Sequence, residues 1–433
     1  MESEIPTTSE ASNGEEKFFT KPILIIFVTI VIDLIGFGIV IPVLPYFVEG
    51  EAFKATPFQL GLLVASFSIM QFIFSPIFGS VSDRYGRRPV LLFSLLGTAA
   101  GFMLVGTATT MWMVFAGRIL DGITGGNIST AQAYIADVTS RKNRAKGMGL
   151  IGAAFGIGFV LGPAIGGILS KFGMQVPFLF AAGMALCNSV ALYFFLPESL
   201  KKDAADRPKR SMNRFAELFD SLTDTRFRMV TLINFLIVTG FSIMTTSFAL
   251  YTLNRFGYDA AQNGYLFAYI GVLAILMQGG IFGRLAERVG ESPLVIAGCL
   301  MLAVSLFVVP FVGPQWGGLA GLLIGMAFFS IGNSIASPAL TTLASKNASE
   351  SEQGKALGVM QSGASLARAV GPLIAGYMLN GAIGHSNSIG SIDDTSLQRT
   401  FWTAGALMTA AVVAAIYFAR SDRGKSRLVA ARA

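Results

Sequence analysis

Long apolar runs recur along the whole chain, and this feature limits its possible folds more than any other. Each run is long enough to cross a bilayer, which requires about 20 residues in a helix. Hydrophobic residues make up 53% of the 433 residues and charged residues only 13%, a balance unlike that of soluble domains. The runs lack the period-two alternation of a membrane barrel. The sequence therefore predicts an all-α membrane protein.

We predict twelve transmembrane helices in two pseudo-symmetric six-helix bundles. The N-terminal bundle is expected over residues 22–196 and the C-terminal bundle over residues 229–419. A linker rich in Lys, Arg and Asp, residues 197–228, joins them, and tails are expected over 1–21 and 420–433. The predicted spans are 22–48, 59–78, 89–108, 111–138, 147–169, 176–196, 229–253, 263–282, 292–312, 315–342, 354–379 and 399–419.

Lysine and arginine gather on one side of the predicted membrane. The exceptions among the 32 basic residues are Lys54, Lys171, Arg255 and Arg399 on the other side, and Arg118 and Arg368 within spans. Because basic loops stay in the cytoplasm, we expect a multi-pass protein with both termini cytoplasmic. The expected location is the plasma membrane, the inner membrane of a bacterium. This asymmetry also explains the net charge of +7, so the expected partner is the lipid bilayer and not nucleic acid.

A charged motif occurs twice, after the second and the eighth predicted spans. Residues Phe78–Arg88 read FGSVSDRYGRR, and residues Phe282–Glu291 read FGRLAERVGE. Both begin with Phe-Gly, carry an acid followed by an arginine, and have a second glycine two residues after that arginine. Both also separate two apolar runs. The pattern predicts short cytoplasmic loops at equivalent positions of two duplicated halves.

The first copy of the motif contains candidate residues for a conformational latch. We expect Asp83 to stabilise one conformation by capping the N-terminal end of a helix in the other half. Asp137, at the end of the fourth span, is the expected partner of Arg87. The arginines also have a simpler interpretation as positive-inside residues. The latch residues are Gly79, Asp83, Arg84, Gly86, Arg87 and Asp137, with Gly283, Glu287 and Arg288 in the second copy.

The fifth and eleventh spans share a pattern of glycine and proline. Residues 162–167 read GPAIGG and residues 371–376 read GPLIAG. Small residues four apart let helix backbones approach closely, and proline bends or weakens a helix. Parallel repeats of this kind suit a transporter that rocks one half against the other. We expect packing between the two halves at Gly158, Gly162, Pro163, Gly166, Gly167, Gly371 and Pro372.

Three charged side chains lie away from the span ends in the N-terminal half, Asp33, Arg118 and Asp121. A charge like that of Asp33 costs about 2.5–3.5 kcal/mol at the bilayer centre, so we expect Asp33 to face a cavity as a candidate proton carrier. Arg118 and Asp121 are three residues apart, hence on one helix face. The alternatives are a packing role for Asp33 and an internal salt bridge for the pair. We favour proton coupling by all three, because burying an ion pair for stability alone gains little.

Further polar residues in the spans are candidates for lining a substrate cavity. The lone histidine, His385, lies in a loop, and both cysteines lie in apolar runs, so no metal site is expected. No nucleophile–base pair or phosphate loop appears either, and we expect neither a cofactor nor an enzyme. The cavity candidates are Gln71, Asn127, Gln278, Asn333, Gln361 and Arg368.

The chain resembles the major facilitator superfamily over residues 22–420 in three of these motifs. GSVSDRYGRRP is similar to its interior-loop signature, GRILDGITGGN to its fourth-span arginine motif, and GIGFVLGPAIGG to its fifth-span antiporter signature. Within the superfamily the N-terminal half is most similar to the tetracycline/proton antiporters. That group carries an acid in the ninth span, whereas SPLVIAGCLMLAVSLFVVPFVG has none.

The resemblance has direct implications for the site residues. It implies that Asp33 is needed for coupled efflux and that Arg118 belongs to the proton-coupling machinery. It further implies a monomer, with Asp83 and Arg87 in a latch and Asp137 as the partner of Arg87. The resemblance implies proton-coupled efflux. Because the ninth-span acid is missing, it does not imply that the substrate is metal-chelated tetracycline.

Three hypotheses about function follow from these observations. The leading one is a proton-coupled antiporter that exports a drug or another amphiphilic small molecule by alternating access. A proton-coupled uptake symporter for a sugar or an organic acid would share the fold and move its substrate the other way. A transport-inactive scaffold or receptor is the third, and the charges within the spans argue against it.

Overall fold

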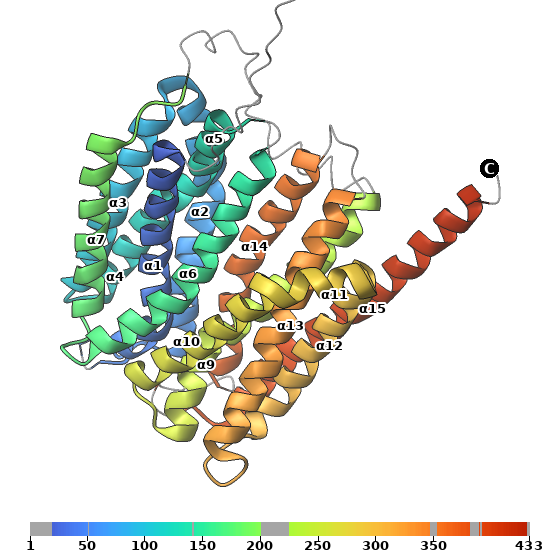
Figure 1. Cartoon of the computed structure of the whole chain (residues 1–433). Helices are drawn as coiled ribbons and strands as arrows, with labels where there is room; N and C mark the ends of the chain where they lie inside the picture. The colour runs from blue at the N-terminus through green and yellow to red at the C-terminus, as the bar shows by residue number, and fades with distance from the viewer. Residues whose placement is uncertain are drawn as a thin grey trace, which may run out of the picture.

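The chain folds as a bundle of long helices (Figure 1). The computed structural model describes residues 20–50, 52–140, 143–200, 225–346, 353–381, 389 and 392–430. Over these residues the chain contains no β-strand, and each predicted span corresponds to a helix or a broken helix. Ten of the described helices are long and apolar enough to cross a membrane. The prediction of an all-α membrane fold is confirmed. His385, most of the predicted tail 1–21 and most of the predicted linker 197–228 lie outside the described residues.

The helices follow one another in two groups that correspond to the predicted halves. In the N-terminal half they are α1 (Lys21–Glu49), α2 (Pro57–Tyr85), α3 (Arg87–Gly106), α4 (Met111–Thr124), α5 (Ile128–Val138), α6 (Arg144–Ser170) and α7 (Val176–Phe195). In the C-terminal half they are α9 (Thr225–Phe256), α10 (Ala260–Leu276), α11 (Phe282–Val289), α12 (Glu291–Val308), α13 (Gly318–Lys346), α14 (Gln353–Leu379) and α15 (Asp394–Ala430).

The fourth span is not the continuous helix predicted over 111–138. A 3₁₀ turn, Gly125–Asn127, separates α4 from α5. The break is stabilised by α2, because Gln71 Nε2 donates a hydrogen bond of 2.9 Å to the Gly125 carbonyl. Ser129 Oγ donates another of 2.9 Å to the carbonyl of Ser75. These bonds satisfy backbone groups that a regular helix would pair internally.

The two charged motifs are helical for most of their length, and the prediction of loops is wrong. Helix α2 continues through Asp83 and Arg84 to Tyr85, and arginine is a good helix former. Only Gly86, with a φ of 104°, interrupts the chain before α3. In the second copy Gly283, Glu287 and Arg288 lie within α11, which ends before Gly290 with a φ of 83°. A positive φ is the conformation that glycine adopts without strain.

Two further boundaries differ from the prediction. Helix α9 begins at Thr225, inside the range predicted as linker, and α15 continues to Ala430, through most of the predicted tail. The eighth span also breaks, because a π-helical turn, Met277–Ile281, separates α10 from α11. A π turn is rare and commonly marks a functional position.

The two halves meet closely at one end of the bundle, which we call the closed end. There α1 of the N-terminal half contacts α10 of the C-terminal half, and Asn263 Nδ2 donates a hydrogen bond of 3.0 Å to Tyr46 Oη. Tyr46 Oη in turn donates to the Tyr258 carbonyl at 3.0 Å. On the other side of the bundle a Cβ at Gly61 of α2 would lie 2.4 Å from the carbonyl oxygen of Pro372 in α14. Glycine is therefore required for this approach.

At the opposite end, which we call the open end, the halves stand apart (Figure 1). A Cβ at Gly149 or Gly152 of α6 would meet no heavy atom of the described residues within 4 Å. The same holds for Gly279 and Gly280 in the π turn, and all four glycines are exposed. The space between the halves is therefore sealed at one end and accessible from the other.

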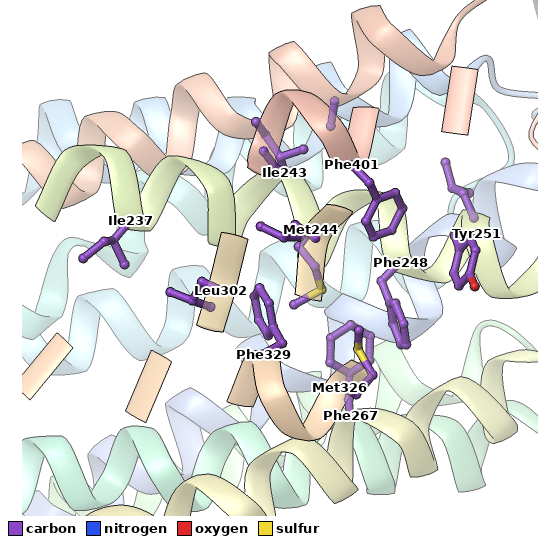
Figure 2. Packing of buried hydrophobic residues seen from close by; sticks show 14 of the residues in the cluster. Ile237, Ile243, Met244, Phe248, Tyr251, Phe267, Leu302, Met326, Phe329 and Phe401 are labelled. Atoms are coloured by element: carbon purple, nitrogen blue, oxygen red, sulfur yellow. The ribbon is translucent and has the colours of Figure 1, made fainter. Parts of the chain in front are cut away.

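The C-terminal half is densely packed with apolar side chains, which belong to a core cluster that also includes residues of the N-terminal half. Figure 2 shows aromatic, aliphatic and methionine side chains from five helices in mutual contact. Close packing of this kind resists deformation, which allows a half to move as one body. The labelled residues are Ile237, Ile243, Met244, Phe248 and Tyr251 of α9, Phe267 of α10, Leu302 of α12, Met326 and Phe329 of α13, and Phe401 of α15.

Candidate functional site

A cavity of about 400 Å³ lies between the two halves and is lined by residues of both. This volume is in the range of small-molecule sites, about 300–1,000 Å³. Most of the lining is apolar, and four charged side chains interrupt it. Three of them, Asp33, Arg118 and Asp121, come from α1 and α4 of the N-terminal half. The fourth, Arg368, comes from α14 of the C-terminal half.

Arg118 and Asp121 form a buried ion pair on one face of α4. Arg118 Nη1 lies 2.8 Å from Asp121 Oδ2, and the two residues are only 2% and 5% exposed. The guanidinium carbon of Arg118 lies 4.4 Å from the ring centre of Phe67, a cation–π contact. The Thr98 hydroxyl lies near the Asp121 carboxyl. The predicted helical spacing therefore brings both charges into the cavity lining, already paired.

Asp33 lies on the facing helix α1, close enough for an electrostatic interaction with Asp121. The side chain of Asn127, in the 3₁₀ turn after α4, lies near the Asp33 carboxyl. Asp33 is half-buried and lines the cavity. The break in the fourth span thus positions an amide beside Asp33. The structure groups the three residues predicted for proton coupling around one part of the cavity.

The structure places four of the six predicted cavity residues in the lining. They are Gln71, Gln278, Asn333 and Arg368. Asn127 is outside the lining because its side chain is buried and directed to Asp33. Gln361 is exposed and lies seven residues before Arg368, about two helical turns nearer the open end. Neither of these last two is among the residues that line the described cavity, and their role there stays a prediction.

Hydroxyl side chains of the C-terminal half also line the cavity, and the sequence analysis missed them. On α13, three serines and Asn333 follow the helical spacing i, i+3, i+4 and i+7. This spacing is a sequence signal for one polar helix face. Ser334 Oγ is buried without a hydrogen-bond partner among the described residues. The polar lining residues of this half include Ser242, Thr245 and Thr246 of α9 and Ser330, Asn333, Ser334 and Ser337 of α13.

The first charged motif forms a compact network at the open end. Arg87 is 5% exposed, and its Nη2 lies 2.5 Å from Asp83 Oδ1. Its Nε lies 3.2 Å from Asp137 Oδ2, and its Nη1 donates to Ser82 Oγ at 2.6 Å. The structure thus brings Arg87 and Asp137 together. Asp83 pairs within its own half, one helical turn from Arg87, and not with a helix end of the other half as predicted. At the open end the halves stand apart, so no described helix of the other half reaches Asp83.

Glu198 completes this network, and the sequence analysis missed it. Its carboxyl oxygens accept hydrogen bonds from the backbone N–H groups of Arg87 at 2.9 Å and Arg88 at 3.1 Å. It therefore caps the N-terminal end of α3, where a negative charge is favourable. The signal was an acid just after the sixth span, on the same side as the arginines. Arg84 is exposed and lies over the Tyr85 ring.

The glycine pattern of α6 is divided between two neighbours, which corrects the predicted packing between the halves. A Cβ at Gly158 would lie 2.6 Å from Leu34 Cβ, and Gly162 and Gly166 make similarly close contacts with α1 of the same half. The adjacent stripe faces the other half, because Gly264 of α10 contacts the Pro163 carbonyl and Gly167 contacts α10 in return. Two stripes of four-residue spacing on one helix point to different sides.

The eleventh span shows the same division. Gly371 of α14 packs on α9 of its own half, where a Cβ would lie 2.5 Å from Ser242 Cβ. Pro372 and Gly376 face Gly61 of α2 in the other half. Prediction of packing between the halves was therefore wrong for Gly158, Gly162, Gly166 and Gly371, while Pro163, Gly167 and Pro372 do lie at the seam. The equivalent geometry in both halves indicates a duplicated unit.

Comparison with known proteins agrees with this architecture. A sequence model described as Major Facilitator Superfamily matches residues 26–348 and 279–433. The chain belongs to this superfamily. A tetracycline resistance protein, class H, from Pasteurella multocida is 32% identical over 92% of this chain and 96% of its own length. Multidrug resistance protein 2 from Bacillus subtilis is 30% identical over 83% of this chain and 89% of its own length.

Solved structures point to the same class. The human organic anion transporter MFSD10 superposes with a TM-score of 0.67 and 25% sequence identity, covering 91% of this chain and 99% of its own. The protein is therefore a multi-pass membrane transporter of the Major Facilitator Superfamily, similar to tetracycline resistance proteins, and not an enzyme. Its substrate is a small molecule, and the cavity between the halves is the candidate site for it.

Proposed function

We propose that the protein exports an amphiphilic small molecule, such as a drug, in exchange for protons by alternating access. The observation that carries this proposal is the arrangement of Asp33 beside the Arg118–Asp121 ion pair in a cavity open at one end. A carboxyl group in such a place binds and releases protons in response to a neighbouring charge. A substrate near Asp33 competes with the proton there, which couples the two movements. Drug export is also supported by relatives that are named resistance proteins.

Alternating access is supported by the nature of the closed end. The halves touch there through two small-residue contacts, around Gly61 and Gly264, and through the hydrogen bond between Asn263 and Tyr46. These contacts follow two close helix pairs, α2 with α14 and α6 with α10, and are concentrated at the closed end, so the halves can separate there while they approach at the open end. The motif around Asp83 and Arg87 lies where the open end would close, which supports a latch role for it.

Orientation is proposed from charge. The exposed basic residues Arg84, Arg228, Arg284 and Arg288 lie at the open end, and basic residues stay in the cytoplasm. We therefore place the open end and both chain termini in the cytoplasm of a bacterial inner membrane, as a monomer without a nucleic-acid partner. The described state is then the one that accepts substrate from inside the cell. Among the described residues no group of acids, histidines or cysteines is suited to a metal ion.

The test begins with growth of an efflux-deficient host against a panel that includes tetracycline, ethidium and norfloxacin. A compound to which the protein confers resistance is then given to proteoliposomes with an acidic lumen. Wild type should accumulate the compound and release luminal protons, and Asp33→Asn should lose at least about 90% of both signals. Asp259→Asn is the matched control, because Asp259 is an exposed N-cap outside the cavity and asparagine caps equally well.

Two results would contradict the proposal. Proton-coupled flux that survives in Asp33→Asn would exclude Asp33 as the coupling residue. Accumulation of a labelled sugar or organic acid in the same direction as the protons would favour the uptake symporter instead. A folded protein that moves no compound from either set would favour the scaffold hypothesis.

A further inference from the structure

Arg368 is the charged cavity residue that the proposed function leaves without a role. It lines the cavity from α14, and none of the acids in the described part of the chain forms an ion pair with it. Its Nη2 donates a hydrogen bond of 3.0 Å to Ser365 Oγ on the same helix. A guanidinium has five N–H donors, so most of its hydrogen-bonding capacity is available to a ligand.

A simpler interpretation of such an arginine is that its side chain snorkels, so that the guanidinium reaches the membrane surface. Arg368 lies 15 residues from the start of α14 and 11 from its end, about 22 Å and 16 Å along the axis at 1.5 Å per residue. These distances exceed what an arginine side chain spans, so its charge stays at the depth of the cavity. An unpaired cation away from water is costly, and an anion in the cavity would offset that cost.

The shape of the guanidinium defines the anion that fits it. Its planar fork matches a carboxylate or a similar oxyanion with two parallel hydrogen bonds. The cavity lining from the same half also includes hydroxyl side chains, such as those of Ser242 and Thr245 on α9. The C-terminal side of the cavity is therefore suited to an acidic group, while the N-terminal side presents the carboxyl of Asp33.

A row of aromatic rings connects these two sides. Phe37 of α1 lies 6.2 Å from Phe159 of α6, and Phe159 lies 6.2 Å from Phe241 of α9 across the seam between the halves. Phe241 stacks on Phe329 of α13 at 5.7 Å. All four line the cavity. Such a row favours a flat aromatic body that extends from one half to the other.

Charge balance decides what the rest of the substrate must be. The Arg118–Asp121 pair is neutral overall, which leaves Asp33 and Arg368 to respond to the substrate. A simple anion would bind Arg368 best when Asp33 carries a proton, and proton and anion would then travel together. Exchange requires competition for Asp33, which a substrate cation provides. An antiporter with a free arginine in its cavity therefore needs a substrate that carries both charges.

We propose that Arg368 is a specificity-determining residue that binds the acidic group of a zwitterionic aromatic amphiphile, whose cationic group lies at Asp33. The acidic-group contact stands on the geometry of Arg368. The zwitterionic character rests in addition on the proposed function, because it follows from proton exchange.

A matched probe series tests the proposal by equilibrium binding to the purified full-length protein in detergent at pH 7. The probes are norfloxacin, which is zwitterionic, its ethyl ester, which keeps only the cation, and its N-acetyl derivative, which keeps only the anion. Arg368→Gln should weaken norfloxacin binding about 10- to 100-fold, the usual effect of losing charge-assisted hydrogen bonds. It should leave ester binding within about twofold. Arg368→Lys should restore part of the loss, because it keeps the charge but not the fork.

Controls separate a binding role from a structural one. Arg228→Gln removes an exposed arginine outside the cavity and should change no affinity. Equal weakening of norfloxacin and its ester by Arg368→Gln would show a folding defect and overturn the proposal, as would unchanged norfloxacin binding. Wild type that binds the N-acetyl anion best, or none of the three probes at millimolar concentration, would overturn the zwitterionic substrate.

The same probes distinguish this proposal from the proposed function. Asp33→Asn should weaken binding of norfloxacin and its ester but not of the N-acetyl anion. If proton exchange persists in Asp33→Asn while the Arg368 result holds, the coupling mechanism fails and the acidic-group site stands. If coupling is lost in Asp33→Asn while Arg368→Gln changes nothing, the coupling mechanism stands and the acidic-group site fails.

Discussion

Each copy of the charged motif forms an ion pair between equivalent helix positions. The acid and the base are exchanged between the two copies. In the first copy Arg87, directly after Gly86, pairs with Asp137 at the end of the fourth span. In the second copy Glu291, directly after Gly290, pairs with Lys346 at the end of the tenth span. Both pairs connect the start of one span to the end of the following span at the open end. The duplicated architecture therefore keeps the contact and not the residues.

The surroundings of the two pairs differ much more than their positions. Arg87 is 5% exposed and also contacts Asp83 and Ser82. The Lys346 side chain is 62% exposed, and α11 has no buried residue. The first pair is the centre of a network within its half, whereas the second is a surface contact.

This difference shows what a repeated sequence motif establishes. The repeat marks equivalent positions, but residues outside the motif decide how much each copy contributes. In the first copy Glu198 and Asp137, both remote in sequence, complete the network. The copies are therefore expected to respond unequally to the same substitution, and three predictions measure that inequality.

The largest effect is expected from Arg87→Gln. It leaves the carboxylates of Asp83 and Asp137 near each other without a cation, and breaking a buried pair costs about 3–5 kcal/mol. Because the Asp83 side chain is 36% exposed, the lower end, roughly 3 kcal/mol, applies. Thermal unfolding in detergent should show a clear decrease in midpoint, and Arg87→Lys should recover part of it. A decrease no greater than that of Glu291→Gln would contradict the comparison.

The two motif glycines should differ by a smaller amount. Gly86 (φ 104°, ψ 154°) and Gly290 (φ 83°, ψ 162°) both have a backbone conformation that is essentially restricted to glycine, so alanine at either position costs about 1–3 kcal/mol. At Gly86 the new Cβ would also lie 2.6 Å from Glu198 Oε2, whereas at Gly290 it meets no described atom within 4 Å. Gly86→Ala should therefore destabilise the protein more than Gly290→Ala in the same unfolding assay. Equal losses would mean that the Glu198 cap does not constrain this position.

The smallest effect is expected from Glu291→Gln. Its partner Lys346 is largely exposed, and surface ion pairs contribute about 0.2–1 kcal/mol. The unfolding midpoint should change little, and the change should shrink further in high salt because exposed charges are screened. A loss comparable with that of Arg87→Gln, or one insensitive to salt, would show that the second copy is as tightly integrated as the first.

The helices of this fold were predictable from sequence, and their interruptions were not. The bilayer sets the length of each apolar run, so a span such as α1 is visible without any tertiary information. The turn at Gly125–Asn127 depends on hydrogen bonds from Gln71 and Ser129. The sequence alone does not show which helix will supply such bonds.

The same limit applies to the glycines and to the cavity. The four-residue spacing of Gly158, Gly162 and Gly166 predicts close packing, but only the structure shows that the partner is α1 of the same half. Charged residues such as Asp33 stand out because they are rare in apolar spans. Serines such as Ser334 do not, since hydroxyl side chains are common in membrane helices and satisfy themselves on the backbone.

The central claim is that a proton on Asp33 shifts the balance between opening at one end and opening at the other. Spin labels at Lys146 of α6 and Arg284 of α11, both exposed at the open end, measure it in a background without Cys187 and Cys299. In wild type the distance distribution should contain a longer and a shorter population whose ratio changes between pH 5 and pH 9. In Asp33→Asn the ratio should be independent of pH. A ratio that follows pH equally in both proteins, or a single distance under all conditions, would contradict the account.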